Sequence, residues 1–122
     1  MEDSTQFALT DRASKIAQLF KTEGWFDDAS EAGVFAAAYV VKNHPDFDPL
    51  TFVPSDAGGS KYNYSTFDSD GTWLRFLQAR YHTTTPRICM KNLIIHGLEI
   101  IGDIIEKRGV IRISDLLESV GD

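Results

Sequence analysis

The chain has 122 residues, 43% of them hydrophobic and 25% charged, which suits one globular domain spanning residues 1–122. Its formal net charge of −6 argues against a protein wrapped in nucleic acid, because phosphate binding requires clustered Lys and Arg. A single cysteine, Cys89, excludes an intramolecular disulfide. The acidic start lacks the features of a leader peptide, and the longest apolar stretch carries charges, so we expect a cytoplasmic protein with no membrane partner.

The chain begins with the order and lengths of a strand, a helix, a turn and a second helix. Over residues 5–10, Phe7 and Leu9 alternate with more polar neighbours, and this period of two predicts a strand. A helix with one apolar stripe is expected over residues 11–23, and a second helix over residues 27–43. Together they predict a strand-helix-helix unit.

Short polar side chains precede both helices. Either Thr10 or Asp11 can cap the first helix by accepting a backbone N–H, and either Asp27 or Asp28 can cap the second. Gly24 follows the first helix and suits the left-handed position at which many helices end. The second helix is rich in small residues, which predicts close packing in a core or a dimer seam. These are Ala29, Ala32, Gly33, Ala36, Ala37 and Ala38.

Residues 44–71 are expected to form a loop, because they hold most of the prolines and several runs of Gly, Ser and Asp. The apolar side chains scattered through this segment favour an ordered loop over a disordered one. A short helix is expected over residues 72–82. Thr85 and Pro86 then mark the start of another helix, because proline is tolerated at the first helical position.

The last long helix is expected over residues 86–108 and is apolar over most of its circumference. Such a helix is buried, either by the rest of the chain or by a second subunit. Its polar residues step by four and three and form one narrow stripe: Asn92, His96, Glu99, Asp103 and Glu106. A brief extended piece is expected over residues 110–113 and a short helix over 115–120. The prediction is a mainly α fold with one or two short strands, in which a strand-helix-helix unit (5–43), a loop-rich segment (44–71) and a helical part (72–122) form one domain.

The sequence contains no convincing catalytic constellation. The run from Asp68 to Thr72 matches the nucleophile motif of haloacid dehalogenase-like phosphotransferases, but it lacks the preceding apolar strand that this motif requires. Within the polar stripe, His96, Glu99 and Asp103 could perform acid–base chemistry or bind a metal, as in a small metal-dependent hydrolase. A solvated or hydrogen-bonded stripe is the simpler interpretation. We therefore predict no catalytic residue, no metal site and no cofactor.

The strand-helix-helix order, with Gln6-Phe7-Ala8-Leu9-Thr10 as the closest stretch, resembles the Arc-type ribbon-helix-helix repressors. In that family two strands pair across a dimer and their outward residues enter the major groove, so the resemblance implies a homodimer that contacts DNA through Gln6 and Thr10. The family also binds phosphate at the start of the second helix, where this chain has carboxylates. The expected phosphate contacts come instead from the basic part of the chain: Arg75, Arg80, Arg87 and Lys91.

Two short motifs resemble a family of small accessory proteins encoded beside bacterial DNA phosphorothioation genes. They are Gly33-Val34-Phe35-Ala36-Ala37-Ala38 and His96-Gly97-Leu98-Glu99-Ile100-Ile101. The resemblance implies a setting in DNA modification and phage defence and transfers no catalytic residue. We expect a non-enzymatic accessory or regulatory protein that binds a protein partner, DNA, or both. The alternatives are a pure protein-interaction module, such as an antitoxin-like, immunity or adaptor subunit, and the small metal-dependent hydrolase.

Overall fold

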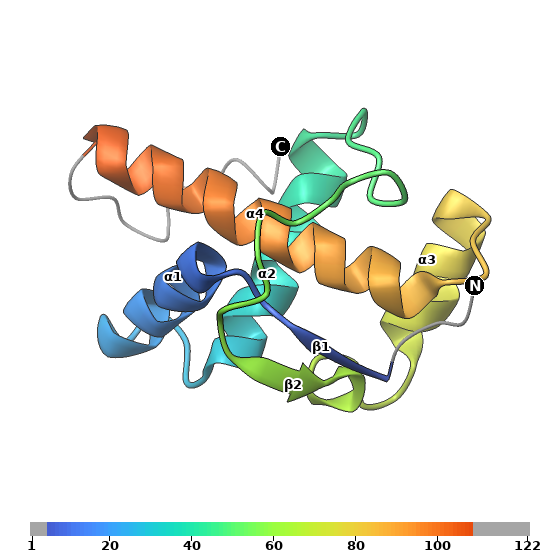
Figure 1. The fold of residues 1–122 in the computed structure, drawn as a ribbon, viewed down its shortest axis with the longest axis horizontal. Helices are drawn as coiled ribbons and strands as arrows, with labels where there is room; N and C mark the ends of the chain where they lie inside the picture. The colour runs from blue at the N-terminus through green and yellow to red at the C-terminus, as the bar shows by residue number, and fades with distance from the viewer. Residues whose placement is uncertain (1–4, 109–122) are drawn as a thin grey trace.

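The computed structural model describes residues 5–108, so the extended piece expected over 110–113 and the helix expected over 115–120 lie outside the described residues. Within residues 5–108 the chain forms four α-helices, one two-stranded antiparallel sheet and a short 3-10 helix (Figure 1). The predicted mainly α fold, with a strand-helix-helix start and a long late helix, is confirmed. The elements are β1 (Gln6–Ala8), α1 (Asp11–Thr22), α2 (Ala29–Asn43), β2 (Lys61–Asn63), η1 (Tyr64–Thr66), α3 (Thr72–Tyr81) and α4 (Pro86–Arg108).

Side-chain caps fix the starts of the first two helices. Thr10 caps α1, since its Oγ1 accepts a hydrogen bond from the backbone N–H of Ala13 at 3.1 Å. Asp28 caps α2 and accepts from the backbone N–H of Glu31 at 3.0 Å. Gly24, just after α1, has a φ of 75°, the left-handed conformation that glycine adopts at little cost.

The helix α4 runs through the middle of the fold and packs against α1, α2 and α3 (Figure 1). The closest approach is between α4 and α2: a Cβ added at Gly97 would lie 2.3 Å from the backbone oxygen of Ala36. On α2, a Cβ added at Gly33 would lie 2.7 Å from the ring of Phe67. Four of the small residues of α2 are buried within the described part of the chain: Ala32, Gly33, Ala36 and Ala37. The buried residues of α4 are Pro86, Cys89, Met90, Asn92, Leu93, Ile94, Ile95, Gly97, Leu98, Ile101 and Gly102.

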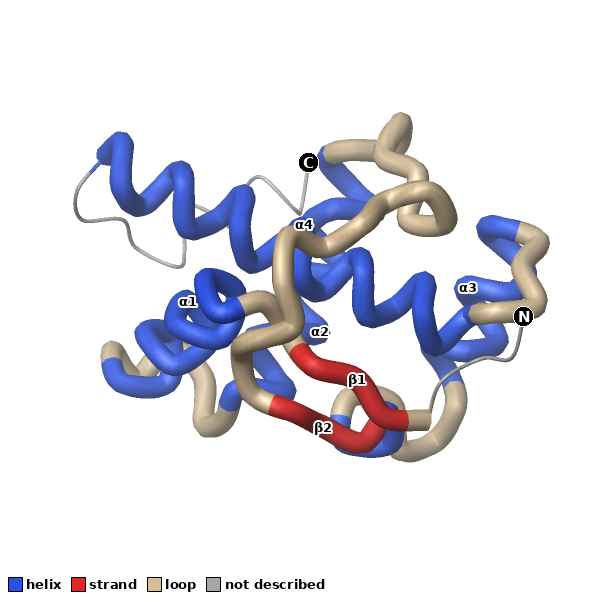
Figure 2. The backbone as a smooth tube through the Cα atoms, in the orientation of Figure 1, coloured by secondary structure: helices blue, strands red, loops and turns tan. Residues whose placement is uncertain are grey.

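The first half of the polar stripe on α4 holds the loop that follows α2. The Nδ2 of Asn92 donates hydrogen bonds to the backbone oxygens of Pro49 at 2.7 Å and Phe52 at 3.3 Å. One turn later the ring of His96 stacks on the ring of Phe47, with centroids 3.9 Å apart and planes 5° apart. Figure 2 shows this loop as a tan tube lying along α4. Phe52, further along the same loop, also lies against the His96 ring, with centroids 5.5 Å apart.

The second half of the stripe faces α1. Thr10 Oγ1 donates a hydrogen bond to Glu99 Oε2 at 2.8 Å. The Arg12 guanidinium pairs with Asp103 and also lies 3.3 Å from Glu106 Oε1. The hydrogen bond that Arg12 donates to Asp103 raises the pKa of Arg12 above its ordinary value. These ion pairs are largely exposed, so each adds no more than about 1 kcal/mol to stability.

The first strand finds its partner within the same chain. β1 pairs with β2 in an antiparallel register that places Gln6 opposite Asn63. The ribbon-helix-helix resemblance implies instead that this partner strand comes from a second subunit. Within the loop-rich segment 44–71, residues 61–66 form β2 and η1. The backbone N–H and C=O groups of β1 require hydrogen-bond partners, and β2, which lies far from β1 in the sequence, provides them.

Candidate functional site

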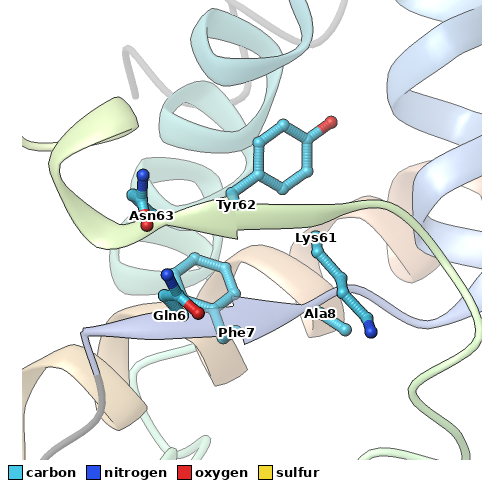
Figure 3. Close-up of a pocket in the computed structure, with 6 residues that line it drawn as sticks. All are labelled: Gln6, Phe7, Ala8, Lys61, Tyr62 and Asn63. Atoms are coloured by element: carbon cyan, nitrogen blue, oxygen red, sulfur yellow. The ribbon is translucent and has the colours of Figure 1, made fainter.

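The ribbon formed by β1 and β2 has one inward and one outward face. Successive side chains of a strand point to opposite faces, so the two paired strands share each face. Phe7 and Tyr62 lie on the inward face, and Phe7 is 8% exposed. Figure 3 shows Gln6 and Asn63 at one end of the ribbon and Lys61 extending over Ala8 at the other. The outward residues are Gln6, Ala8, Lys61 and Asn63.

Aromatic packing holds the inward face on the core. The ring of Phe7 stacks on the ring of Phe67, with centroids 5.4 Å apart, and the ring of Tyr62 meets Phe67 edge-on at 5.0 Å. Aromatic pairs at these separations contribute about 0.5–1.5 kcal/mol beyond the area that they bury. The ribbon is therefore a supported surface, although each strand has only three residues.

The backbone hydrogen bonds of the ribbon identify which residue pairs lie closest. The N–H of Tyr64 donates to the oxygen of Thr5 at 2.8 Å. In an antiparallel ladder hydrogen-bonded and non-hydrogen-bonded pairs alternate, so Gln6 and Asn63, the next pair along, do not exchange backbone hydrogen bonds with each other. Cα atoms in such pairs are about 4.5 Å apart, which brings the two side-chain amides close together.

Two basic residues border the ribbon. Arg87 and Lys91 lie one turn apart near the start of α4, and both are half-buried. Together with Gln6, they line a hollow of about 380 Å³ between β1, α4 and the loop that contains Asp56. The guanidinium carbon of Arg87 also lies 5.7 Å from the centroid of the Tyr64 ring. Gln6, Arg87 and Lys91, three of the residues predicted from sequence to contact DNA, thus line the same hollow.

The other two predicted arginines lie on α3. Arg75 Nη1 donates to the backbone oxygen of Asp70 at 3.4 Å. The guanidinium carbon of Arg80 lies 4.9 Å from the centroid of the Tyr81 ring. Both are exposed, and neither lines the hollow beside β1. The structure therefore does not bring Arg75 and Arg80 into the group formed by Gln6, Arg87 and Lys91.

Thr10 is fully buried, which corrects the prediction that it contacts DNA. Its Oγ1 accepts from the N–H of Ala13 and donates to Glu99, so it is occupied by the start of α1 and by α4. The physical reason is that β1 ends at Ala8. Thr10 therefore follows the geometry of a helix cap and not the alternation of a strand.

Lys61 and Asn63 belong to the outward face but were not among the residues predicted to contact DNA. A local signal for them exists in the sequence. Lys61-Tyr62-Asn63-Tyr64 alternates polar and aromatic residues and follows a pair of glycines, a pattern typical of a short strand after a turn. The segment is short and lies within a loop-rich region, so the signal is weak.

The three stripe residues considered for catalysis have separate structural roles. His96 stacks on Phe47, Glu99 accepts from Thr10, and Asp103 pairs with Arg12. Burial lowers the pKa of His96, which favours the neutral form of its ring. Over residues 5–108, no three His, Cys, Asp or Glu side chains are grouped to hold a metal ion.

Comparison with known proteins does not extend the two resemblances seen in the sequence. No family model matches the chain, and neither a curated protein nor a solved structure matches it. None of the described helices combines the length and the apolar character needed to cross a membrane.

The two motifs that resemble the phosphorothioation-associated proteins pack against each other. Gly97, in the second motif, meets the backbone of Ala36, in the first. Ala36 and Leu98 are both fully buried. The motifs therefore form the crossing of α2 and α4, and a resemblance at these positions concerns the core of the fold.

Proposed function

We propose that the chain is a cytoplasmic, non-enzymatic accessory or regulatory protein of a bacterial DNA-modification or phage-defence system, and that it binds DNA through the ribbon of β1 and β2. The observation that carries this proposal is the outward face of the ribbon, which holds Gln6, Lys61 and Asn63. At its border Gln6 shares one hollow with Arg87 and Lys91, and Asn63 shares another with Arg87. The bacterial setting rests on the resemblance of the two core motifs. The DNA contact rests on the geometry of the ribbon.

A two-stranded ribbon suits the major groove of DNA. The groove is about 12 Å wide and admits either an α-helix or a two-stranded β-ribbon, whose strands lie about 4.8 Å apart. Amide side chains such as Gln6 and Asn63 can hydrogen-bond to base edges, and Lys61 can reach guanine or phosphate. Arg87 and Lys91 lie beside the ribbon, where the sugar–phosphate backbone would pass, and can neutralise phosphates there.

The small number of cations sets the expected strength and salt dependence of binding. If Lys61, Arg87 and Lys91 each neutralise one phosphate, log K falls with log salt at a slope of about −2.7. The affinity then drops about 40-fold between about 50 and 200 mM salt. The net charge of −6 repels DNA elsewhere on the surface, so we expect weak binding at physiological salt unless a protein partner adds contacts.

Fluorescence anisotropy with a short labelled duplex tests the proposal. The full chain is titrated over this salt range, beside an Arg87→Ala/Lys91→Ala variant, for which we expect a slope closer to zero by about two. A Lys21→Ala/Lys42→Ala variant is the matched control, because it removes two exposed positive charges that do not border the ribbon. Absence of binding, or an affinity that does not depend on salt, would refute DNA binding at this site.

A pure protein-interaction module is the second candidate, and the loop held by α4 favours it. Val53 is 82% exposed and Leu50 is 46% exposed on this loop. Asp46 and Asp48 lie close to them in sequence and are exposed. Apolar side chains near carboxylates suit a basic partner with an apolar recess. A Leu50→Ser/Val53→Ser variant should lose a co-purifying basic partner that the wild type retains, and equal recovery by both would contradict this candidate.

Homodimer formation, implied by the ribbon-helix-helix resemblance, is a separate proposal because the ribbon is complete within one chain. Light scattering after size exclusion tests it directly. A mass of twice 13.6 kDa supports a dimer, and a mass of 13.6 kDa across the concentration range contradicts it.

A further inference from the structure

We infer that the cross-strand pair of Gln6 and Asn63 makes the ribbon select duplexes that present adenine in the major groove. The inference rests on the proposed DNA binding at the ribbon and adds the base that this site prefers. It follows from three features of the pair: its place on the outward face, its close spacing, and its amide chemistry.

The two amides project from a supported backbone. Both residues are exposed and lie on the outward face, at the same end of the ribbon (Figure 3). The next pair along the ribbon is the inward pair of Phe7 and Tyr62, whose rings pack on Phe67. The backbone that carries the amides is thus fixed, so the ordering of side chains on binding costs less than it would on a mobile loop.

The amide group complements adenine and not guanine. Adenine presents one acceptor, N7, and one donor, the N6 amino group, and the NH₂ and oxygen of Gln or Asn match both at once. Guanine presents two acceptors, N7 and O6, so one amide oxygen would face another oxygen. Gln6 and Asn63 are adjacent across the ribbon, so both amides can engage one A·T-rich step.

The other outward pair reads a different base pair. Ala8 and Lys61 stand two residues along the strands, a separation of about 6.8 Å, or about two base-pair rises. Lysine suits guanine O6 and N7 or a phosphate, and the Ala8 methyl suits a thymine methyl. Removing the two amides should therefore change the adenine preference and leave the charge-driven part of binding intact.

The test compares three labelled duplexes by fluorescence anisotropy with the full chain at low salt. One has a central AA/TT step, one has GG/CC there, and one has the AA/TT step with 7-deazaadenine, which keeps base pairing but lacks the N7 acceptor. We expect the adenine duplex to bind about 5- to 150-fold tighter than the GG/CC duplex. The 7-deazaadenine duplex should bind more weakly than its unmodified parent, which excludes a preference based on groove shape alone.

Two variants separate base reading from charge. In Gln6→Ala/Asn63→Ala we expect the ratio of the affinities for the AA/TT and GG/CC duplexes to fall to near one, while the salt dependence of binding stays the same. In Arg87→Ala/Lys91→Ala we expect every duplex to bind more weakly while the ratio is retained. Should the alanine pair fail to fold, the single variant Gln6→Met keeps the side-chain length without the amide and should lower the ratio in part.

The outcomes distinguish this inference from the proposed function. Salt-dependent binding with equal affinity for all three duplexes would overturn the adenine preference and leave DNA binding standing. Absence of binding to any duplex would overturn both. A preference for adenine that survives in Gln6→Ala/Asn63→Ala would assign the selectivity to other residues and would also overturn the inference.

Discussion

The crossing of α2 and α4 gives the sharpest test of the fold. At Gly97 the two helices approach so closely that a Cβ would lie 2.3 Å from the backbone oxygen of Ala36 and 2.7 Å from its carbonyl carbon. Backbone atoms in the middle of a helix cannot move aside as a side chain can. Gly97→Ala therefore requires α2 to shift away from α4, which loosens the packing along the whole crossing.

The expected cost combines two opposing effects. Overpacking of a core costs about 1–3 kcal/mol, and a backbone contact as short as this one belongs at the upper end. Alanine is more favourable than glycine inside a helix by about 1 kcal/mol. We therefore expect Gly97→Ala to lower the free energy of unfolding by about 2 kcal/mol. That loss lowers the urea midpoint by about 1 M and the Tm by about 8 °C for a domain of this size.

Gly102→Ala is the matched control, because Gly102 lies on the same helix and gains the same helix propensity. Its added Cβ would lie 2.8 Å from Cδ1 and 2.9 Å from Cγ1 of Ile16, a half-buried side chain that can move aside as a helix backbone cannot. We expect this variant to unfold within about 0.5 kcal/mol of wild type. Urea unfolding followed by circular dichroism measures both. A Gly97→Ala protein as stable as wild type, or equal losses in both variants, would refute the reasoning.

Three further predictions concern contacts made by single side chains. Thr10→Val removes the cap of α1 and the hydrogen bond to Glu99, and should lower the free energy of urea unfolding by about 1–2 kcal/mol. Thr10→Ser keeps the hydroxyl and should recover most of that loss. Equal losses in the two variants would contradict these two roles of Thr10. Asn92→Leu removes the two hydrogen bonds that hold the loop after α2. Limited proteolysis should therefore cut that loop faster than in wild type, and an unchanged cleavage rate would argue against Asn92 as its anchor. His96, whose pKa is lowered by burial and by His44, binds a proton more readily in the unfolded chain. Its contribution to stability is therefore complete above a pH of about 6.5 and is lost as pH falls below that value. The free energy of unfolding of wild type should fall relative to that of His96→Phe as the solution is made acidic. A difference between the two proteins that does not change with pH would disprove this prediction.

Most of the helical architecture could be predicted from the sequence, because helix ends carry local signals. The glycine after α1 and the proline that begins α4 act on the backbone at their own positions, and both helices lie close to their expected bounds. The start of α2 was predicted two residues early. The structure explains the difference: Asp28 is the cap, so the first helical residue is Ala29.

The partner of the first strand could not be predicted with the same security, because strand pairing depends on residues far apart in sequence. Only three residues of β2 pair with β1. The close contact at Gly59, where an added Cβ would lie 2.4 Å from the backbone oxygen of Thr10, is invisible until both segments are placed. A period-two pattern of this length predicts a strand without indicating its partner.

The candidate site was predicted in part. Gln6, Arg87 and Lys91 were predicted from the sequence, and the structure places them around one hollow. Thr10 was misassigned because strand alternation was extended past the end of β1 into a helix cap. Asn63 lies opposite Gln6 in the ribbon. This pairing depends on the cross-strand register, so it could be identified only from the structure.

The most direct test of the central claim is a two-dimensional NMR titration of the folded chain with a short adenine-containing duplex. DNA binding at the ribbon predicts salt-dependent chemical-shift changes at the backbone amides of Gln6, Ala8, Lys61 and Asn63, and at the side-chain amides of Gln6 and Asn63. The amides of α2, on which no outward ribbon residue lies, should remain unshifted. Shifts confined to the loop around Leu50 and Val53, or no shifts at all, would contradict the account.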